Sequence, residues 1–167
     1  MFNLPDKKIR IGDMNLNARA ASYVLMQFIL LALLILAPRD ASLYGDLRLP
    51  LSILGLVLIA AGMGIILYSF FALGRSLTAS PVPKEDGQLI TNGLYARVRH
   101  PIYFGLLLAA FGVVLDAGPW PQLAIFLLLL VLLNIKASFE EQLLSQRYPE
   151  YKEYSKKTPR FFPRLAS

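Results

Sequence analysis

Residues 91–105 form a polar, basic stretch that runs directly into an apolar segment of the chain. This stretch holds the only histidine of the sequence, His100, with Arg99 before it and Tyr103 three residues after it. Arginine and histidine can bind a ligand carboxylate, and the face of a tyrosine ring can contact a ligand cation. Polar residues of these types at the start of an apolar segment predict one half of a cofactor pocket.

A second polar group, Glu140 and Glu141, follows a leucine-rich segment. The two carboxylates can accept hydrogen bonds from hydroxyl or ammonium groups of a ligand. Consecutive residues of a helix lie about 100° apart around its axis, so the two side chains do not share a face. We expect Glu141 to face the pocket, whereas Glu140 can instead form a surface ion pair with Lys136, four residues earlier.

Arg147 follows the glutamate pair, and its planar guanidinium can hold a substrate carboxylate through two hydrogen bonds. The alternative for Arg147 is a solvated charge at the end of a helix. For Arg97, Arg99 and His100 the alternative is an anchoring role at a membrane interface. The presence of both polar groups in one chain favours the binding role for His100 and Tyr103, and leaves Arg97 open.

The composition is that of a membrane protein. Hydrophobic residues make up 56% of the 167 residues and charged residues 17%, whereas soluble domains carry about a quarter of charged residues. The mean hydropathy is +0.52. The length fits one domain. The absence of cysteine excludes disulfides, thiolate metal sites and cysteine nucleophiles, and a single histidine makes a zinc site unexpected.

Four apolar runs predict about four transmembrane helices. They are the segments between Arg19 and Arg39, from Leu49 to Gly74, between Arg99 and Asp116, and from Pro121 to Ile135. Pro101 suits the first turn of the third helix. Beyond Ser138 the sequence becomes amphipathic, and a second short helix is expected at residues 150–157. The predicted fold is an all-α polytopic membrane helix bundle with cytoplasmic amphipathic helices at the C-terminal end.

The distribution of positive charge predicts the orientation. Four spans place both termini on one side of the membrane, and that side then carries 15 of the 17 Lys and Arg residues. Such an excess is typical of the cytoplasmic side, so we interpret the net charge of +6 as a membrane-surface feature and not as nucleic-acid binding. The expected single domain comprises a cytoplasmic tail (1–17), a four-helix membrane bundle (18–139) and a cytoplasmic helical tail (140–167).

Two sequence patterns together resemble those of a known family. They are Gly93-x-Tyr95-x-x-x-Arg99-His100-Pro101-x-Tyr103-x-Gly105 and Glu140-Glu141-x-x-Leu144-x-x-x-Tyr148-x-x-Tyr151-x-x-Tyr154. The pair is similar to the isoprenylcysteine carboxyl methyltransferase family and to the broader group of membrane methyltransferases that includes the phospholipid N-methyltransferases. The resemblance covers about residues 74–154. It departs from the family pattern at Tyr148-Pro149, where phenylalanine followed by glycine is more common.

The resemblance implies that the two segments close over S-adenosyl-L-methionine at the cytoplasmic face of a lipid bilayer. It also implies that the methyl group goes to a lipophilic acceptor, either a small molecule or a prenylated one. The cofactor-binding residues that it implies are Tyr95, Arg99, His100, Pro101, Tyr103, Gly105, Glu140 and Glu141. Arg147 and Tyr103 are the catalytic candidates, and no metal is expected.

Two types of acceptor stay open. A carboxylate, as in isoprenylcysteine-type carboxyl O-methylation, is already ionised at neutral pH and needs only orientation, for which Arg147 is suited. A phospholipid amine or another amine must first lose a proton to a carboxylate or to His100. Two other interpretations are a sterol-reductase-like protein, which shares an Arg-His-Pro-x-Tyr element, and a non-catalytic helical membrane subunit.

Overall fold

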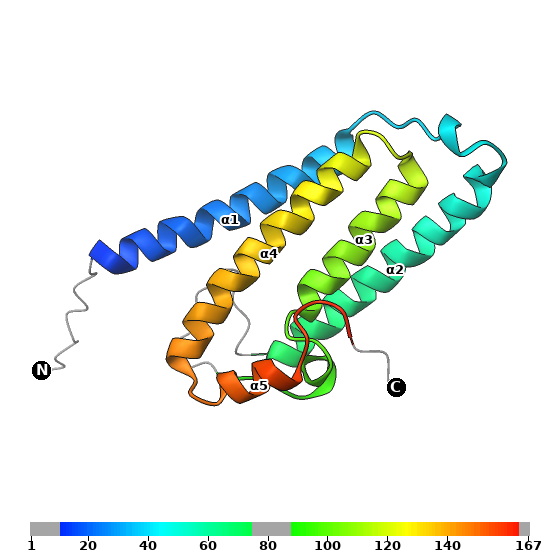
Figure 1. Ribbon diagram of the computed structural model, residues 1–167. Helices are drawn as coiled ribbons and strands as arrows, with labels where there is room; N and C mark the ends of the chain where they lie inside the picture. The colour runs from blue at the N-terminus through cyan, green and yellow to red at the C-terminus, as the bar shows by residue number, and fades with distance from the viewer. Residues whose placement is uncertain (1–10, 75–87, 164–167) are drawn as a thin grey trace, which may run out of the picture.

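The computed structural model describes residues 11–74 and 88–163, which form a bundle of helices (Figure 1). The helices are α1 (Ile11–Leu36), α2 (Arg48–Leu73), α3 (Pro101–Ala117), α4 (Gln122–Arg147) and α5 (Tyr151–Lys157), with short 3-10 helices η1 (Ser42–Leu47) and η3 (Gly93–Ala96). No strand occurs in this part of the chain. Segments of α1, of η1 with α2, and of α4 are long and apolar enough to cross a membrane, and α3 is a shorter apolar helix. The all-α polytopic membrane bundle is therefore confirmed.

Most helix boundaries agree with the sequence signals. α3 begins at Pro101, as the proline at its first turn predicts. α1 ends shortly before Pro38, and α5 ends at Lys157, before Thr158 and Pro159. The exception is the start of α1, because Ile11 to Asn17 are helical although they were assigned to the tail. Residues 75–87, between α2 and η3, lie outside the described residues.

Four glycines bring α2 and α3 into close antiparallel contact. A Cβ atom at Gly55 would lie 2.5 Å from the carbonyl oxygen of Gly112, and one at Gly62 would collide with the carbonyl oxygen of Gly105. In each helix the two glycines are seven residues apart, so they occupy one face. Small residues allow membrane helices to approach this closely. Gly55 and Gly62 thus pack against α3, whereas Gly64 has open space around it.

The main hydrophobic core lies where α1, α3 and α4 meet. It is built from leucines and other apolar residues of these helices and from one aromatic residue of the C-terminal segment: Leu30, Leu34, Tyr103, Leu107, Ala110, Leu129, Leu133, Ala137 and Phe161. α1 runs along α4 (Figure 1), and the Tyr23 and Phe139 rings meet edge to face with centroids 5.6 Å apart. This core fixes the position of α4, which carries the glutamate pair.

Polar contacts fix the end of the bundle away from α5. Asp116 accepts hydrogen bonds from Arg39 Nη1 (3.1 Å) and from Ser52 Oγ (2.6 Å). Gln122, which is fully buried, donates from Nε2 to the Pro38 carbonyl oxygen at 2.9 Å. At the opposite end the start of α3, the end of α4 and α5 come together (Figure 1). The two polar groups predicted from the sequence therefore lie at the same end of the bundle.

Candidate functional site

The polar stretch before α3 is held in place by the C-terminal segment. His100 precedes the first residue of α3, and the Pro101 side chain is fully buried behind it. The backbone nitrogen of Arg99 donates to the Pro159 carbonyl oxygen at 2.9 Å, and that of His100 donates to the Arg160 carbonyl oxygen at 3.1 Å. These two hydrogen bonds set the direction in which the Arg99 and His100 side chains leave the backbone.

The His100 imidazole lies beside both glutamates of α4. Its Nε2 is 3.1 Å from Glu141 Oε1, and its Nδ1 is 3.6 Å from Glu140 Oε2. The Tyr103 hydroxyl donates to the same Glu140 oxygen at 2.9 Å, and its ring stacks on the imidazole with centroids 5.1 Å apart. The two halves of the predicted pocket are therefore in direct contact.

Both glutamates face this element, which corrects one expectation. Among the described residues Glu140 makes no ion pair with Lys136 within 4.0 Å. Lys136 is instead buried and turned toward α1, where its Nζ donates to Gln27 Oε1 at 2.7 Å. The i,i+4 spacing allows an ion pair between Lys136 and Glu140, but Lys136 contacts α1 instead. Glu140 therefore contacts Tyr103 and His100.

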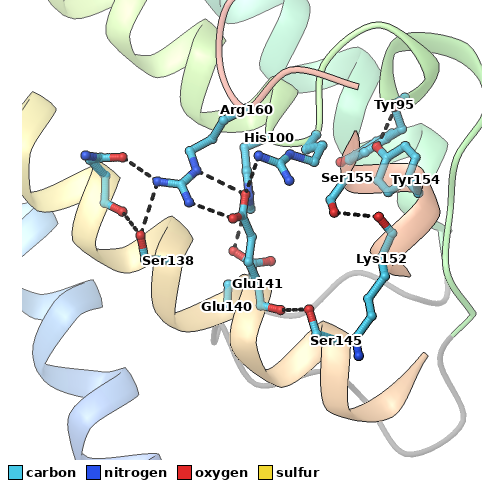
Figure 2. Close-up of polar contacts among 12 residues, drawn as sticks. Tyr95, His100, Ser138, Glu140, Glu141, Ser145, Lys152, Tyr154, Ser155 and Arg160 are labelled. Carbon is cyan, nitrogen blue, oxygen red and sulfur yellow. Dashed lines mark hydrogen bonds and ion pairs between the residues drawn. The ribbon is translucent and has the colours of Figure 1, made fainter. Parts of the chain in front are cut away.

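Two arginines and the His100 imidazole surround the Glu141 carboxylate (Figure 2). Arg160 binds it through two hydrogen bonds, Nε to Oε1 at 3.1 Å and Nη2 to Oε2 at 2.7 Å. Arg99 Nη2 lies 3.3 Å from Oε1, where His100 also makes its contact. With two charge-assisted hydrogen bonds from one guanidinium, the carboxylate is rigidly held.

Arg160 also joins this network to the middle of α4. Its Nη1 donates to Asn134 Oδ1 at 2.6 Å and to Ser138 Oγ at 3.1 Å (Figure 2). The side-chain oxygen of Asn134, an exposed residue of this apolar helix, thereby has a protein partner. Next along the chain, the Phe161 ring lies edge-on to the His100 ring with centroids 6.0 Å apart. The C-terminal segment thus completes the site.

Several buried polar atoms of this region have no partner. They are Tyr95 Oη, Tyr151 Oη and Arg99 Nε. Buried polar groups in proteins are nearly always hydrogen-bonded, so each such atom calls for an explanation. Unpartnered donors and acceptors that lie beside carboxylates fit a polar ligand with complementary groups.

Burial raises the pKa of three tyrosines in this region, Tyr95, Tyr151 and Tyr154. Burial raises the pKa of Tyr95 well above its usual range, and the nearby Glu140 carboxylate adds to the rise. Burial likewise raises the pKa of Tyr151, with Glu141 as a further cause. Burial also raises the pKa of Tyr154 to about 12, and its hydroxyl donates to the Tyr95 carbonyl oxygen at 2.5 Å. The Tyr95 and Tyr151 hydroxyls are therefore available as hydrogen-bond donors.

The arrangement suits a ligand that carries both an anion and hydroxyl or ammonium groups. The Arg99 guanidinium can bind the anion, and the Glu140 carboxylate, which is partly exposed, can accept from hydroxyl or ammonium. Within residues 11–74 and 88–163, no three His, Asp or Glu side chains are grouped so that they could hold a metal ion.

Most of the predicted site residues come together. Tyr95, Arg99, His100, Pro101, Tyr103, Glu140 and Glu141 all belong to this end of the bundle. Gly105 is one turn further along α3 and packs against Gly62 and Ile66 of α2. Arg147 lies in the last turn of α4, exposed, with its guanidinium 5.7 Å from the centroid of the Tyr148 ring. The roles assigned to these residues in binding and catalysis stay predictions.

The sequence patterns do not predict that Arg160 and Phe161 belong to the site. They stand in a polar tail with no helical or strand periodicity, so no pattern linked them to Glu141. One signal was present, because Phe161 and Phe162 lie between two prolines after a charged helix. Two aromatic residues in such a place indicate a segment that docks on the rest of the protein.

Residues 51–151 match the model of the phospholipid methyltransferase family. The chain belongs to this family. The matched range runs from α2 to the first residue of α5, so it includes the start of α3 and the glutamate pair of α4. Arg160 and Phe161 lie beyond it.

The curated relatives of this chain are named either as metal resistance proteins or as methyltransferases. The chain is 30% identical over 145 residues to the cobalt-zinc-cadmium resistance protein CzcN of Cupriavidus metallidurans, which covers 86% of this chain and 62% of that protein. It is 34% identical over 88 residues to the nickel-cobalt-cadmium resistance protein NccN of Alcaligenes xylosoxydans xylosoxydans (50% of this chain, 39% of that protein). It is 36% identical over 110 residues to a probable protein-S-isoprenylcysteine O-methyltransferase of Oryza sativa subsp. indica (64% and 58%). The chain thus spans less than two thirds of each of these relatives.

Proposed function

We propose that this chain transfers the methyl group of S-adenosyl-L-methionine to a lipophilic acceptor at the cytoplasmic face of a membrane. The observation that carries the proposal is the group of buried, unpartnered polar atoms, Tyr95 Oη, Tyr151 Oη and Arg99 Nε, beside the glutamates of α4. Membership of the phospholipid methyltransferase family supports it independently.

The donor set fits this cofactor, which carries a carboxylate, an ammonium, ribose hydroxyls and a sulfonium. Arg99 would bind the carboxylate, and Glu140 would accept from a ribose hydroxyl or the ammonium. Tyr103, whose hydroxyl donates to Glu140, would keep that carboxylate in position beside the cofactor. When bound, S-adenosyl-L-methionine supplies an already activated methyl group, so the contribution of the protein is mainly to position the reactants.

Glu141 has a different task in this proposal. Its carboxylate is already bound by Arg160, Arg99 and His100. It therefore holds these side chains in place, and Glu140 is the glutamate that would touch the cofactor. His100 fixes the Glu140 carboxylate from one side and Tyr103 fixes it from another.

A carboxylate is the acceptor that we favour, in a reaction that forms a methyl ester. A carboxylate is ionised at neutral pH, so the site needs to orient it but not to deprotonate it. The rice relative, named a probable protein-S-isoprenylcysteine O-methyltransferase, supports this choice. The name of the matched family supports the alternative, an amine of a phospholipid or of another lipid.

The cytoplasmic placement rests on charge. The site lies at the end of the bundle that contains α5, and α5 carries Lys152, Lys156 and Lys157. Arg39 and Arg48 belong to the opposite end. Under the positive-inside rule, four spans then leave both termini in the cytoplasm.

Binding of the demethylated product, S-adenosylhomocysteine, distinguishes a methyltransferase from a sterol-reductase-like protein and from a non-catalytic subunit. It should raise the midpoint of thermal unfolding of the purified protein in neutral detergent. Stabilisation by NADPH in its place would point to a sterol-reductase-like protein, and no effect of either would favour a non-catalytic subunit.

The chemical stability of the product separates the acceptors. Membranes that contain the protein are incubated with S-adenosyl-L-methionine labelled in the methyl group, and the lipid extract is treated with mild alkali. Label released as methanol identifies a methyl ester. Label that survives alkali identifies N-methylation.

A further inference from the structure

Lys136 is a buried cation inside the membrane bundle. Only 6% of its surface is exposed. Its Nζ lies 2.7 Å from Gln27 Oε1 of α1 and 5.0 Å from the centroid of the Tyr103 ring. It therefore belongs to neither the lipid-facing surface nor the network around Glu141.

This ammonium has no ion-pair partner among the described residues. No carboxylate of the described residues lies within 4.0 Å of it. Glu140 is one helical turn away, but its carboxylate accepts from Tyr103 and faces His100. Ionised side chains are costly at membrane depth and mark functional sites there when they occur. An ammonium has three donors, and only one of them is used by a described acceptor.

Gln27 supplies a second hydrogen-bond donor that could bind an anion beside Lys136. Its carbonyl oxygen accepts from Lys136, which leaves its amide nitrogen as a donor at the same place. Gln27 is partly exposed, and its neighbours Met26 and Phe28 are exposed to 50% and 62% on the outside of α1. The pair therefore lies just inside the lipid-facing surface.

We propose that Lys136 and Gln27 bind the carboxylate of the lipophilic acceptor. This inference rests on the proposed methyl transfer and names the residues that select its substrate. An ammonium and an amide nitrogen attract an anion, whereas a protonated amine at the same place would be repelled. Lys136 lies about 6 Å deeper along α4 than Glu140, since four residues of a helix rise by that amount. The acceptor would thus meet the cofactor from the membrane side, next to Tyr103.

This assignment differs from the one that the sequence suggests for Arg147. Arg147 lies seven residues beyond Glu140, about two turns toward the end of α4, and is exposed. Lys136 lies on the other side of Glu140 and is buried. The two residues can therefore be tested against each other.

The test measures how strongly the protein distinguishes an acid from its own ester. The protein is placed in phosphatidylcholine nanodiscs, and the binding of radiolabelled N-acetyl-S-farnesylcysteine is compared with that of its methyl ester. The wild-type protein should bind the acid about tenfold more tightly, a difference of about 1.4 kcal/mol. Lys136→Gln should abolish this preference, and Lys136→Arg, which keeps the charge, should retain most of it.

Three further variants complete the design. Gln27→Leu should weaken the preference, and it tests the same pair at a partly exposed position if Lys136→Gln does not fold. Lys152→Gln removes an exposed charge of α5 and should leave the preference unchanged. A wild-type protein without preference for the acid, or a preference that Lys136→Gln retains and Arg147→Gln removes, would overturn the proposal.

Stabilisation by S-adenosylhomocysteine is measured on the same samples. If the wild-type protein is not stabilised, the methyltransferase function itself fails. If it is stabilised and Lys136→Gln is stabilised equally, the cofactor site is intact and the acid preference alone decides the role of Lys136.

Discussion

His100 Nε2 lies 3.1 Å from Glu141 Oε1, although 41 positions separate the two residues in the chain. This contact joins the start of α3 to α4, and Arg160 joins the C-terminal segment to the same carboxylate. Three separate parts of the chain are therefore oriented by one side chain. Glu141 acts as their common acceptor, and the proposed function therefore assigns the ligand contacts to Glu140 and the unpartnered tyrosine hydroxyls.

Replacing Glu141 by glutamine should destabilise the protein and weaken cofactor binding. Glutamine has nearly the same size but carries no charge to neutralise Arg99 and Arg160. Breaking a buried ion pair by removing one partner costs about 3 kcal/mol or more. Thermal unfolding should show a lower midpoint, and the affinity for S-adenosylhomocysteine should fall more than tenfold. A variant with unchanged affinity would remove Glu141 from the supporting network.

Arg160→Lys tests the geometry of that network at constant charge. A lysine cannot reproduce the pair of hydrogen bonds from the guanidinium to Glu141, nor the bonds to Asn134 and Ser138. We expect an affinity for S-adenosylhomocysteine about tenfold lower, equivalent to about 1.4 kcal/mol. Arg97→Lys, at an exposed position just before α3, is the matched control. Equal effects of the two changes would mean that Arg160 contributes only its charge.

Two glycines of α2, Gly62 and Gly64, allow a controlled test of the contact between α2 and α3. A Cβ atom at Gly62 would collide with the backbone of Gly105 in α3, whereas one at Gly64 would meet nothing within 4 Å. Gly62→Ala should therefore lower the free energy of unfolding by about 2 kcal/mol, as overpacked sites do. Gly64→Ala should raise it by up to about 1 kcal/mol, because alanine favours the helix. Thermal unfolding in detergent measures both, and similar effects would contradict the close contact.

Arg147→Lys tests the catalytic role predicted for this residue. If the guanidinium orients the acceptor, methyl transfer should slow while binding of S-adenosylhomocysteine stays the same, because the planar pair of donors is lost but the charge is kept. Turnover with labelled cofactor and calorimetric binding are measured on one preparation. Loss of both in equal measure would speak against an acceptor role, and loss of neither would agree with assigning the acceptor to Lys136.

The convergence of the two polar groups could be predicted because it depends on few variables. An even number of apolar helices between His100 and Glu141 and a strongly uneven charge distribution place them at one end of the bundle. Pro101 also marks the start of α3. Periodicity and charge are properties of the sequence itself, so these features needed no knowledge of tertiary contacts.

The contacts that the sequence did not reveal are long-range and irregular. Arg160 reaches Glu141 because the segment after α5 pairs with the backbone of residues 99 and 100, and no local pattern encodes such pairing. The partner of Lys136 is on α1, so spacing within α4 suggested Glu140 instead. Gly64 lies about 200° around the helix from Gly62, which is why only one of them meets α3.

The central claim is that a cofactor with an anion and hydroxyl groups occupies the polar end of the bundle. Calorimetric titration of S-adenosylhomocysteine into the wild-type protein and into Tyr95→Phe tests it most directly. The wild-type protein should bind one equivalent. Tyr95→Phe should bind about threefold to tenfold more weakly without any loss of stability in the absence of ligand, because the buried hydroxyl has no partner in the protein. No saturable binding to the wild-type protein would contradict the claim.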